Sequence, residues 1–199
     1  MPLPAGQYGG ALAAAAAALS WERTEIVKFL VEKGADVNMP LQTGHYGSAL
    51  AVAASKGETE IVKFLVEKGA DVNMPLLAGQ YGSALAAAAS GGRIEIVKFL
   101  VEKGAEVNMP LPAGRYGSAL IAAAYWGWKA CVEVLIISGA KVNLILDIEA
   151  IYTHLEAAGG DVSTENEEFI WWDTRDVESR RQEKVEVADL LRRHAVGSL

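Results

Sequence analysis

The sequence predicts an all-α fold, a solenoid of paired antiparallel helices joined by finger loops and closed by a divergent C-terminal cap. Three observations predict it. One stretch, Tyr81–Arg115, recurs along the chain in altered copies. Each copy holds two short helix-forming segments. Neither segment is long enough to be stable alone in water, so the copies must stack to bury their apolar faces.

The copies follow one another at a nearly constant spacing. Tyr46, Tyr81 and Tyr116 begin three of them and stand 35 residues apart, and an earlier copy begins at Tyr8. A fixed period of this length indicates stacked repeats in which each unit contacts only its neighbours. The four predicted repeats, which together make up residues 1–143, span about residues 8–45, 46–80, 81–115 and 116–143.

The unit that begins at Tyr81 shows why each segment is helical. Ser83 is a suitable N-cap for the run of small apolar residues 84–89, which strongly favours a helix. A glycine pair ends that helix, and residues 95–103 form a second one with a broad apolar face. Gly104 follows, where helices commonly end in a left-handed residue. The alanines let the first helices of successive units approach closely.

Two motifs recur in the units over residues 8–143. They read Ser-Ala-Leu-x-x-Ala-Ala-x-x-Gly and then Ile-Val-x-x-Leu-x-x-x-Gly-Ala-Asp-Val-Asn. Together they resemble the ankyrin repeat. The copies depart from it in having Ser-Ala-Leu-Ala for the usual Thr-Pro-Leu-His, and about two extra residues near the finger loop Gly79–Tyr81. The resemblance implies an intracellular protein that holds a protein partner on its concave surface.

Both ends of the array differ from the inner units. Met1–Gly6 matches Met109–Gly114, so we expect the chain to start inside the loop that would close a preceding unit. We expect Ala11–Leu19 to be the first helix of the first unit. Residues 144–199 are expected to form a degenerate fifth repeat and C-terminal cap with an acidic, tryptophan-containing insertion.

The closing helix of the cap is predicted over residues 175–194. The second helix of the fourth unit would otherwise expose Val134, Ile136 and Ile137, and burying a side chain of that size is worth about 1.5–3 kcal/mol. We therefore expect the closing helix to cover them, and a chain ending at Asn143 to aggregate. The apolar face of the closing helix consists of Val185, Val187, Leu190 and Leu191.

Composition and charge argue against several functions. The formal net charge is −7, and all of this excess falls in residues 144–199, so no basic stripe for nucleic acid is present. No apolar run approaches the length that spans a membrane. Cys131 is the single cysteine, which excludes a disulfide framework and fits a reducing compartment. We expect a cytoplasmic monomer with Cys131 packed in the core.

Motifs of catalysis are missing from the sequence. It has no Gly-rich phosphate loop, no metal-ligand cluster and no nucleophile elbow. We therefore expect no catalytic residue, no cofactor and no metal, although the carboxylates of the insertion keep an enzyme open as an alternative. The leading hypothesis is a non-catalytic ankyrin-type scaffold that binds another protein.

Positions that change between otherwise equal units are the candidate partner-binding residues. They precede the repeated tyrosines in the finger loops or end the first helices, which in the ankyrin family line the concave partner surface. Neutral variation of exposed positions is the alternative explanation. The candidates are His45, Lys56, Gln80, Arg115, Tyr125 and Trp126. The tyrosines that open the four units do not vary, which predicts a stacked ladder that stiffens the fingers.

A second hypothesis is a small-molecule site or an enzyme. A pocket for a small apolar molecule would lie between the fourth unit and the C-terminal insertion, with Tyr125 and Trp126 among its aromatic walls. Such a site would be deep and mostly enclosed. The alternative is that the aromatic residues form the core of the cap and that its carboxylates are solvated. The further pocket candidates are Trp128, Glu167, Glu168, Trp171, Trp172 and Asp173.

Overall fold

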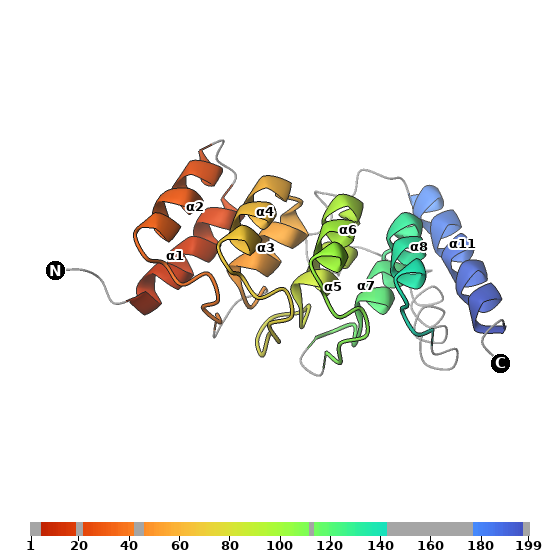
Figure 1. Ribbon diagram of the computed structural model, residues 1–199. Coiled ribbons are helices and arrows are strands. Elements are labelled where there is room, and N and C mark those ends of the chain that lie inside the picture. Colours follow the sequence, from red (N-terminus) through yellow and green to blue (C-terminus); the bar gives the residue numbers. More distant parts are fainter. Residues whose placement is uncertain (1–4, 19–21, 42–45, 112–113, 143–176, 197–199) are drawn as a thin grey trace.

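A computed structural model describes residues 5–18, 22–41, 46–111, 114–142 and 177–196. Within these ranges four helix pairs follow one another in a row, no strand is present, and α11 lies beyond the last pair (Figure 1). The first helices of the pairs are α1 (Ala5–Ala17), α3 (Ala49–Lys56), α5 (Ala84–Ser90) and α7 (Ala119–Tyr125). The second helices are α2 (Arg23–Glu32), α4 (Thr59–Glu67), α6 (Ile94–Glu102) and α8 (Lys129–Ile137), and the chain closes with α11 (Val177–Val196).

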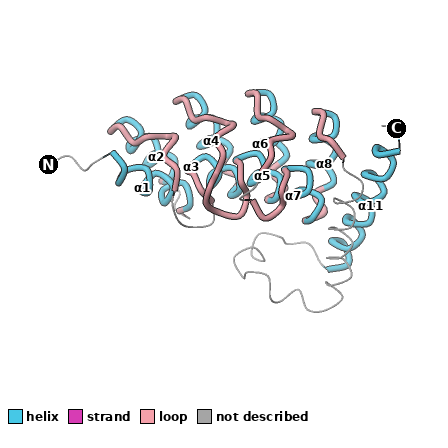
Figure 2. The backbone as a smooth tube through the Cα atoms, turned by 90° about the horizontal axis from the view of Figure 1, so that it is seen from below, coloured by secondary structure: helices cyan, strands magenta, loops and turns pink. Residues whose placement is uncertain are grey.

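The helices form two layers. Each first helix contacts the next first helix, and each second helix contacts the next second helix. The loops between pairs project together to one side of the row, the side from which Figure 2 views the chain. We call the side made by the first helices and these finger loops the inner face. The all-α solenoid of paired helices predicted from the sequence is confirmed.

The first helices pack closely because their residues are small. Every residue of α5 is buried, and α3 is equally covered up to its last residue. A serine caps the N-terminus of each of these helices, as predicted for Ser83. The Ser83 hydroxyl accepts a hydrogen bond of 3.1 Å from the backbone N–H of Ala86. Ser48 and Ser118 cap α3 and α7 with the same geometry.

The first unit lacks this cap, and its helix begins earlier than we expected. The position equivalent to Ser48 is Gly10, which has no side chain to bind the first amides. The helix α1 therefore runs through this point and begins at Ala5, not at Ala11. The prediction for the start of the first helix was wrong for this reason.

A ladder of asparagines joins each unit to the next. The side-chain amide of Asn73 donates to the carbonyl oxygen of Gly104 at 2.9 Å, and its oxygen accepts from the N–H of Glu106 at 2.7 Å. Asn38 and Asn108 make the same two bonds with the units that follow them. Backbone groups of the loop that follows each second helix are thus satisfied across the repeat boundary.

Helix α11 packs against α8 and α7, as expected for a closing helix. Val187 and Leu191 are fully buried, and the ammonium of Lys129 on α8 lies 3.0 Å from a carboxylate oxygen of Glu186. The expected coverage was wrong for Ile137, which stays 86% exposed, and Val185 of the closing face is 44% exposed. The aggregation of a chain ending at Asn143 stays a prediction.

Candidate protein-interaction surface

The finger loops are held in place by close backbone contact. Gly47 and Gly82 have φ values of 77° and 75°, a region that side chains disfavour, and their carbonyl oxygens accept hydrogen bonds from Leu41 and Leu76. A Cβ atom at Gly47 would lie 2.5 Å from the carbonyl oxygen of Ala78 in the next finger. Only glycine allows the fingers to approach this closely, and each finger delivers the tyrosine beside its glycine to the inner face.

Two of these tyrosines stack between neighbouring units. The ring centroids of Tyr46 and Tyr81 are 5.8 Å apart, with an interplanar angle of 29°. Tyr81 is 1% exposed, and burial raises the pKa of its phenol far above the usual value, although the hydroxyls of Ser55 and Ser90 oppose part of this shift. The predicted ladder is confirmed for this pair, and Tyr81 is a buried part of the scaffold.

The ladder ends in an aromatic cluster at the fourth unit. The ring of Tyr125, at the end of α7, lies 5.3 Å from that of Tyr116 and 5.3 Å from that of Trp126, measured between centroids. The indole N–H of Trp126 donates a hydrogen bond of 3.0 Å to the Tyr116 hydroxyl. Tyr116 and Tyr125 are buried and Trp126 is half-buried, so the cluster is rigid and keeps one edge toward solvent.

Three cations lie near tyrosine rings of the ladder and of this cluster. The Arg115 guanidinium is 5.9 Å from the Tyr116 centroid and 5.7 Å from that of Tyr125. The ammonium of Lys184, on α11, is 5.4 Å from the same Tyr125 ring, and that of Lys56 is 5.9 Å from the Tyr46 ring. These are cation–π distances. We call these rings and cations the aromatic–cation surface. It consists of Tyr46, Lys56, Arg115, Tyr116, Tyr125, Trp126 and Lys184.

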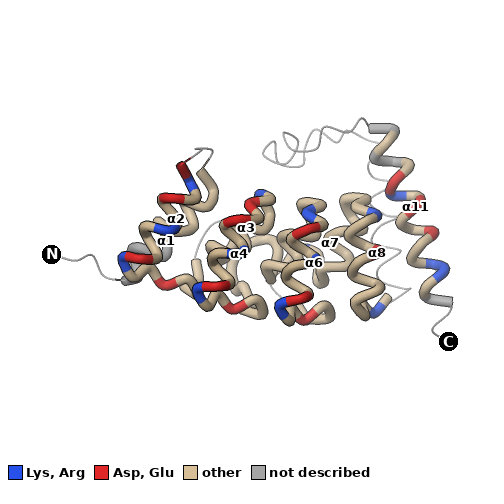
Figure 3. The backbone as a smooth tube through the Cα atoms, turned by 45° about the horizontal axis from the view of Figure 1, so that its top comes forward, with Lys and Arg blue, Asp and Glu red and all other residues tan. Residues whose placement is uncertain are grey.

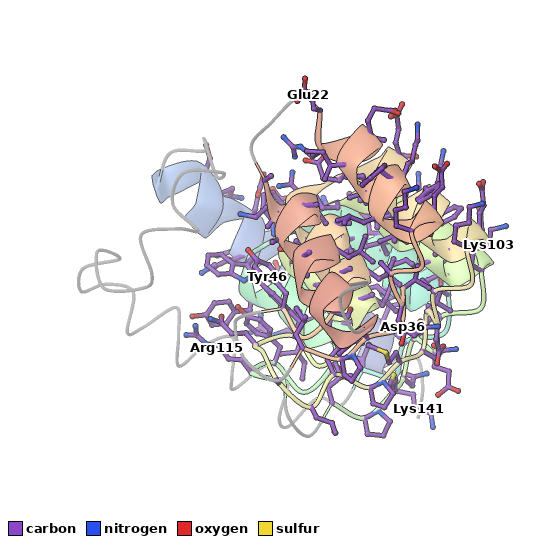
Figure 4. All side chains as sticks on the ribbon, turned by 90° about the vertical axis from the view of Figure 1, so that its left-hand side faces the viewer. Glu22, Asp36, Tyr46, Lys103, Arg115 and Lys141 are labelled. Carbon is purple, nitrogen blue, oxygen red and sulfur yellow. The ribbon has the colours of Figure 1, made fainter. Side chains whose placement is uncertain are left out.

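The structure brings together three of the predicted partner-binding residues, Arg115, Tyr125 and Trp126, and places Tyr46 and Arg115 on the same side of the molecule (Figure 4). Lys56 joins them at the far end of the tyrosine pair. Gln80 is linked through its backbone, because its carbonyl oxygen accepts a 2.7 Å hydrogen bond from the Arg115 N–H. His45 lies outside the described residues.

Sequence reasoning missed three members of this surface, and one of them, Tyr46, was assigned to the tyrosine ladder alone. Tyr116 was assigned to the ladder alone, although it supplies the acceptor for Trp126. Lys184 gave no signal, because it stands in a helix whose position over Tyr125 depends on tertiary packing. For Tyr116 the signal was present: the aromatic pair at 125–126 follows it by about the length of one short helix.

The alternative pocket residue Trp128 has a different position from its neighbour Trp126. Its indole N–H donates a 2.8 Å hydrogen bond to the carbonyl oxygen of Ser90, and its ring lies against Gly92. Arg93, the equivalent residue one unit earlier, binds Ser55 in the same way at 3.1 Å. Trp128 therefore bridges two units at the turn between helices.

An open hollow of about 400 Å³ lies beside Trp128, lined also by Cys131 and by Glu183 of α11. Burial raises the pKa of the Cys131 thiol to about 12, and its side chain is 1% exposed, in keeping with the predicted core role. The other pocket candidates, which are Glu167, Glu168, Trp171, Trp172 and Asp173, lie outside the described residues. The pocket between the fourth unit and the insertion stays a prediction.

The second helices carry charges of both signs. Acidic and basic residues are interspersed over α2, α4 and α6 (Figure 3), where Lys28 pairs with Glu25 and Lys98 with Glu95.

Among the residues that the structure describes, no group of three His, Cys, Asp or Glu side chains is placed to hold a metal ion. In the same part of the chain, every helix is too short or too polar to cross a membrane.

Comparison with known proteins agrees with this architecture. A family model described as ankyrin repeats in three copies matches residues 8–76 and again residues 75–145. A search of curated proteins finds no match. The two matched segments cover most of the chain and include all four helix pairs, from Tyr8 onward. The chain therefore belongs to the ankyrin-repeat family.

Proposed function

We propose that this protein is a non-catalytic ankyrin scaffold that binds a protein partner on its inner face, which is the concave face of the family. Ankyrin repeats are generally protein-interaction modules. The proposal extends this general role to a particular surface of this chain, the aromatic–cation surface.

The observation that carries the proposal is the cluster of Arg115, Tyr116, Tyr125 and Trp126. Arginine, tyrosine and tryptophan are enriched among the residues that dominate binding energy at protein interfaces. Here the rings are ordered by a hydrogen bond and by mutual packing before any partner arrives. A partner would order few side chains on binding, and this ordering is one of the main costs of association.

The alanine framework beneath the cluster supports the same function. The first helices are buried by their own neighbours, so their spacing is set by the scaffold. Substitutions at the finger positions and at the ends of the first helices can change recognition while this framework stays constant. The inner face therefore separates the residues that fold the protein from those that meet a partner.

The proposal is tested by affinity capture from native extract with the immobilised 199-residue chain. The test variant is Arg115→Ala with Trp126→Ala. The matched control is Phe29→Ala with Lys33→Ala, which removes a cation 5.4 Å from an aromatic centroid on the outer helix α2. The test variant should lose partners that the wild type and the control both recover. Equal recovery by all three proteins, each shown by thermal melting to be folded at the capture temperature, would contradict the assignment of the inner face.

A further inference from the structure

We infer that three charged side chains at the starts of the second helices determine which unit stacks on which as the chain folds. They are Arg23, Glu58 and Arg93, which occupy equivalent positions of the first three units. This role in the order of the units does not depend on the proposed partner surface.

Apolar packing alone does not distinguish the second unit from the third. Residues 46–80 and 81–115 differ at seven of 35 positions, and α4 and α6 differ only at their first residue. Ile61, Val62 and Leu65 of α4 are buried, and the same residue types are buried at the equivalent positions of α6. A chain that stacked α6 directly on α2, with the second unit left out, would therefore bury the same apolar groups. Such misassembly is a characteristic failure of repeat proteins.

The charge at the start of each second helix does distinguish the units. Arg23 of the first unit forms an ion pair with Glu58 of the second, and the two side chains are only 19% and 27% exposed. Burial lowers the pKa of Arg93 in the third unit, and the Glu58 carboxylate opposes that shift, so these two charges attract each other. Positive, negative and positive side chains thus follow one another along the first three units.

Arg93 is held beside Glu58 by the backbone of the second unit. Its Nε donates a hydrogen bond of 3.1 Å to the carbonyl oxygen of Ser55, in the last turn of α3. A Cβ atom at Gly57 would lie 3.0 Å from the same Nε, so the Arg93 side chain lies against the residue that precedes Glu58. The attraction between the two charges therefore belongs to an ordered contact between the second and third units.

Leaving out the second unit would reverse the electrostatics of the stack. Arg93 would then take the place of Glu58 beside Arg23, and like charges would meet at a site that is partly shielded from water. The carboxylate that attracts both guanidiniums would be lost at the same time. The native order thus gains an attraction at each of two junctions, and the order without the second unit replaces them with a repulsion.

The experiment measures the distance between the first and fourth units after refolding from denaturant. Glu32 and Ile137 occupy equivalent, exposed positions of α2 and α8. Glu32→Cys and Ile137→Cys therefore carry nitroxide spin labels, in a Cys131→Ala background of the 199-residue chain. Double electron–electron resonance reports the separation of the labels. Packed helices lie about 8–10 Å apart, which gives roughly 24–30 Å for the native order and roughly 16–20 Å with one unit left out.

The test variant exchanges the first pair of charges, Arg23→Glu with Glu58→Arg. It keeps the composition and the attraction between positions 23 and 58. However, it places an arginine beside Arg93, and it lets position 23 attract Arg93 when the second unit is left out. The matched control exchanges an exposed ion pair within α6, Glu95→Lys with Lys98→Glu, which also keeps the composition. A milder variant, Glu58→Gln, removes only the shared carboxylate.

If these charges set the order, the labelled parent and the control give the long distance alone. The test variant then gives a second population, shifted by about 10 Å to the short distance. Glu58→Gln gives the same population at a lower fraction, and it decides by the same criterion if the test variant does not refold. The long distance alone in every protein that refolds would overturn the inference, and so would an equally large short-distance population in the control or the parent.

Discussion

Trp126 and Tyr116 are joined by a hydrogen bond of 3.0 Å from the indole N–H to the phenolic oxygen, across the end of α7. This bond ties the finger loop to the first helix of the same unit. We predict that Tyr116→Phe and Trp126→Phe each lower the free energy of unfolding, the former by about 0.5–1.5 kcal/mol.

A double-mutant cycle measured by urea denaturation checks this coupling. Because each substitution breaks the same bond, the double variant should cost less than the sum of the two single variants. Strictly additive losses would show that the two side chains act independently and that the bond does not hold the finger to α7.

The second prediction compares two isoleucines that lie in identical local sequences. Both α2 and α4 contain the segment Thr-Glu-Ile-Val-Lys-Phe-Leu-Val-Glu, but Ile61 in α4 is 1% exposed and Ile26 in α2 is 40% exposed. Helix α4 packs against α2 of the preceding unit, whereas the helix contacts of α2 among the described residues are with α1 and α4. Ile61→Ala should cost about 2–5 kcal/mol of unfolding free energy, and Ile26→Ala less than half as much. Equal costs, measured by chemical denaturation, would refute the stacking order.

The asparagine ladder gives a third prediction. Asn73→Ala removes both the donor to Gly104 and the acceptor for Glu106, which should lower the unfolding free energy by about 1–2 kcal/mol. Asn73→Asp is the matched control, because a carboxylate still accepts from the Glu106 N–H but cannot donate to the Gly104 carbonyl. It should therefore keep the acceptor bond, lose the donor bond and place a carboxylate oxygen against the Gly104 carbonyl oxygen. A melting curve of Asn73→Ala that overlays the wild type would show that the ladder does not couple the units.

Burial of Cys131 predicts a pH-dependent reactivity. Its pKa in the folded protein is about 12, against an ordinary value of 9.0, so the thiol is protonated near pH 8 and shielded from reagents. An aromatic disulfide reagent should react roughly a thousandfold more slowly with the native protein than with the denatured one. Equal rates would place the thiol at the surface.

The same shift affects stability at alkaline pH. The folded pKa is raised, so the stabilisation from keeping the thiol protonated is complete below the unfolded pKa of 9.0 and is lost as the pH rises toward 12. The wild type should therefore lose more stability over this interval than Cys131→Ala does. Parallel decline of the two proteins, followed by thermal melting, would contradict the assigned pKa.

Local signals allowed much of the fold to be predicted from the sequence. The N-cap at Ser83 and the left-handed residue at Gly104 depend on contacts within a few residues, and both occur as expected. The stacking of the units followed from the period and from the shortness of the helices. Arg115, Tyr125 and Trp126, which the structure brings together, could be chosen as candidates because they vary at positions where the scaffold is constant.

Features that depend on distant contacts could not be predicted in this way. The place of Lys184 over Tyr125 and the 86% exposure of Ile137 both depend on how α11 docks on the fourth unit. The hydrogen bond from the Trp128 indole to Ser90 of the preceding unit could not be read from sequence spacing. The first unit has Gly10 where the other units have the capping serine, and the repeat period alone does not show that α1 begins at Ala5.

Hydrogen exchange of the 199-residue chain, with and without a partner recovered by affinity capture, tests the central claim most directly. Binding at the aromatic–cation surface should slow amide exchange in the finger residues 114–118, at the end of α7 and in the first half of α11. Exchange in α2, α4 and α6 should be unchanged, since these helices lie in the other layer. Protection confined to the second helices, with no change around Arg115 and Trp126, would contradict the claim that the inner face binds the partner.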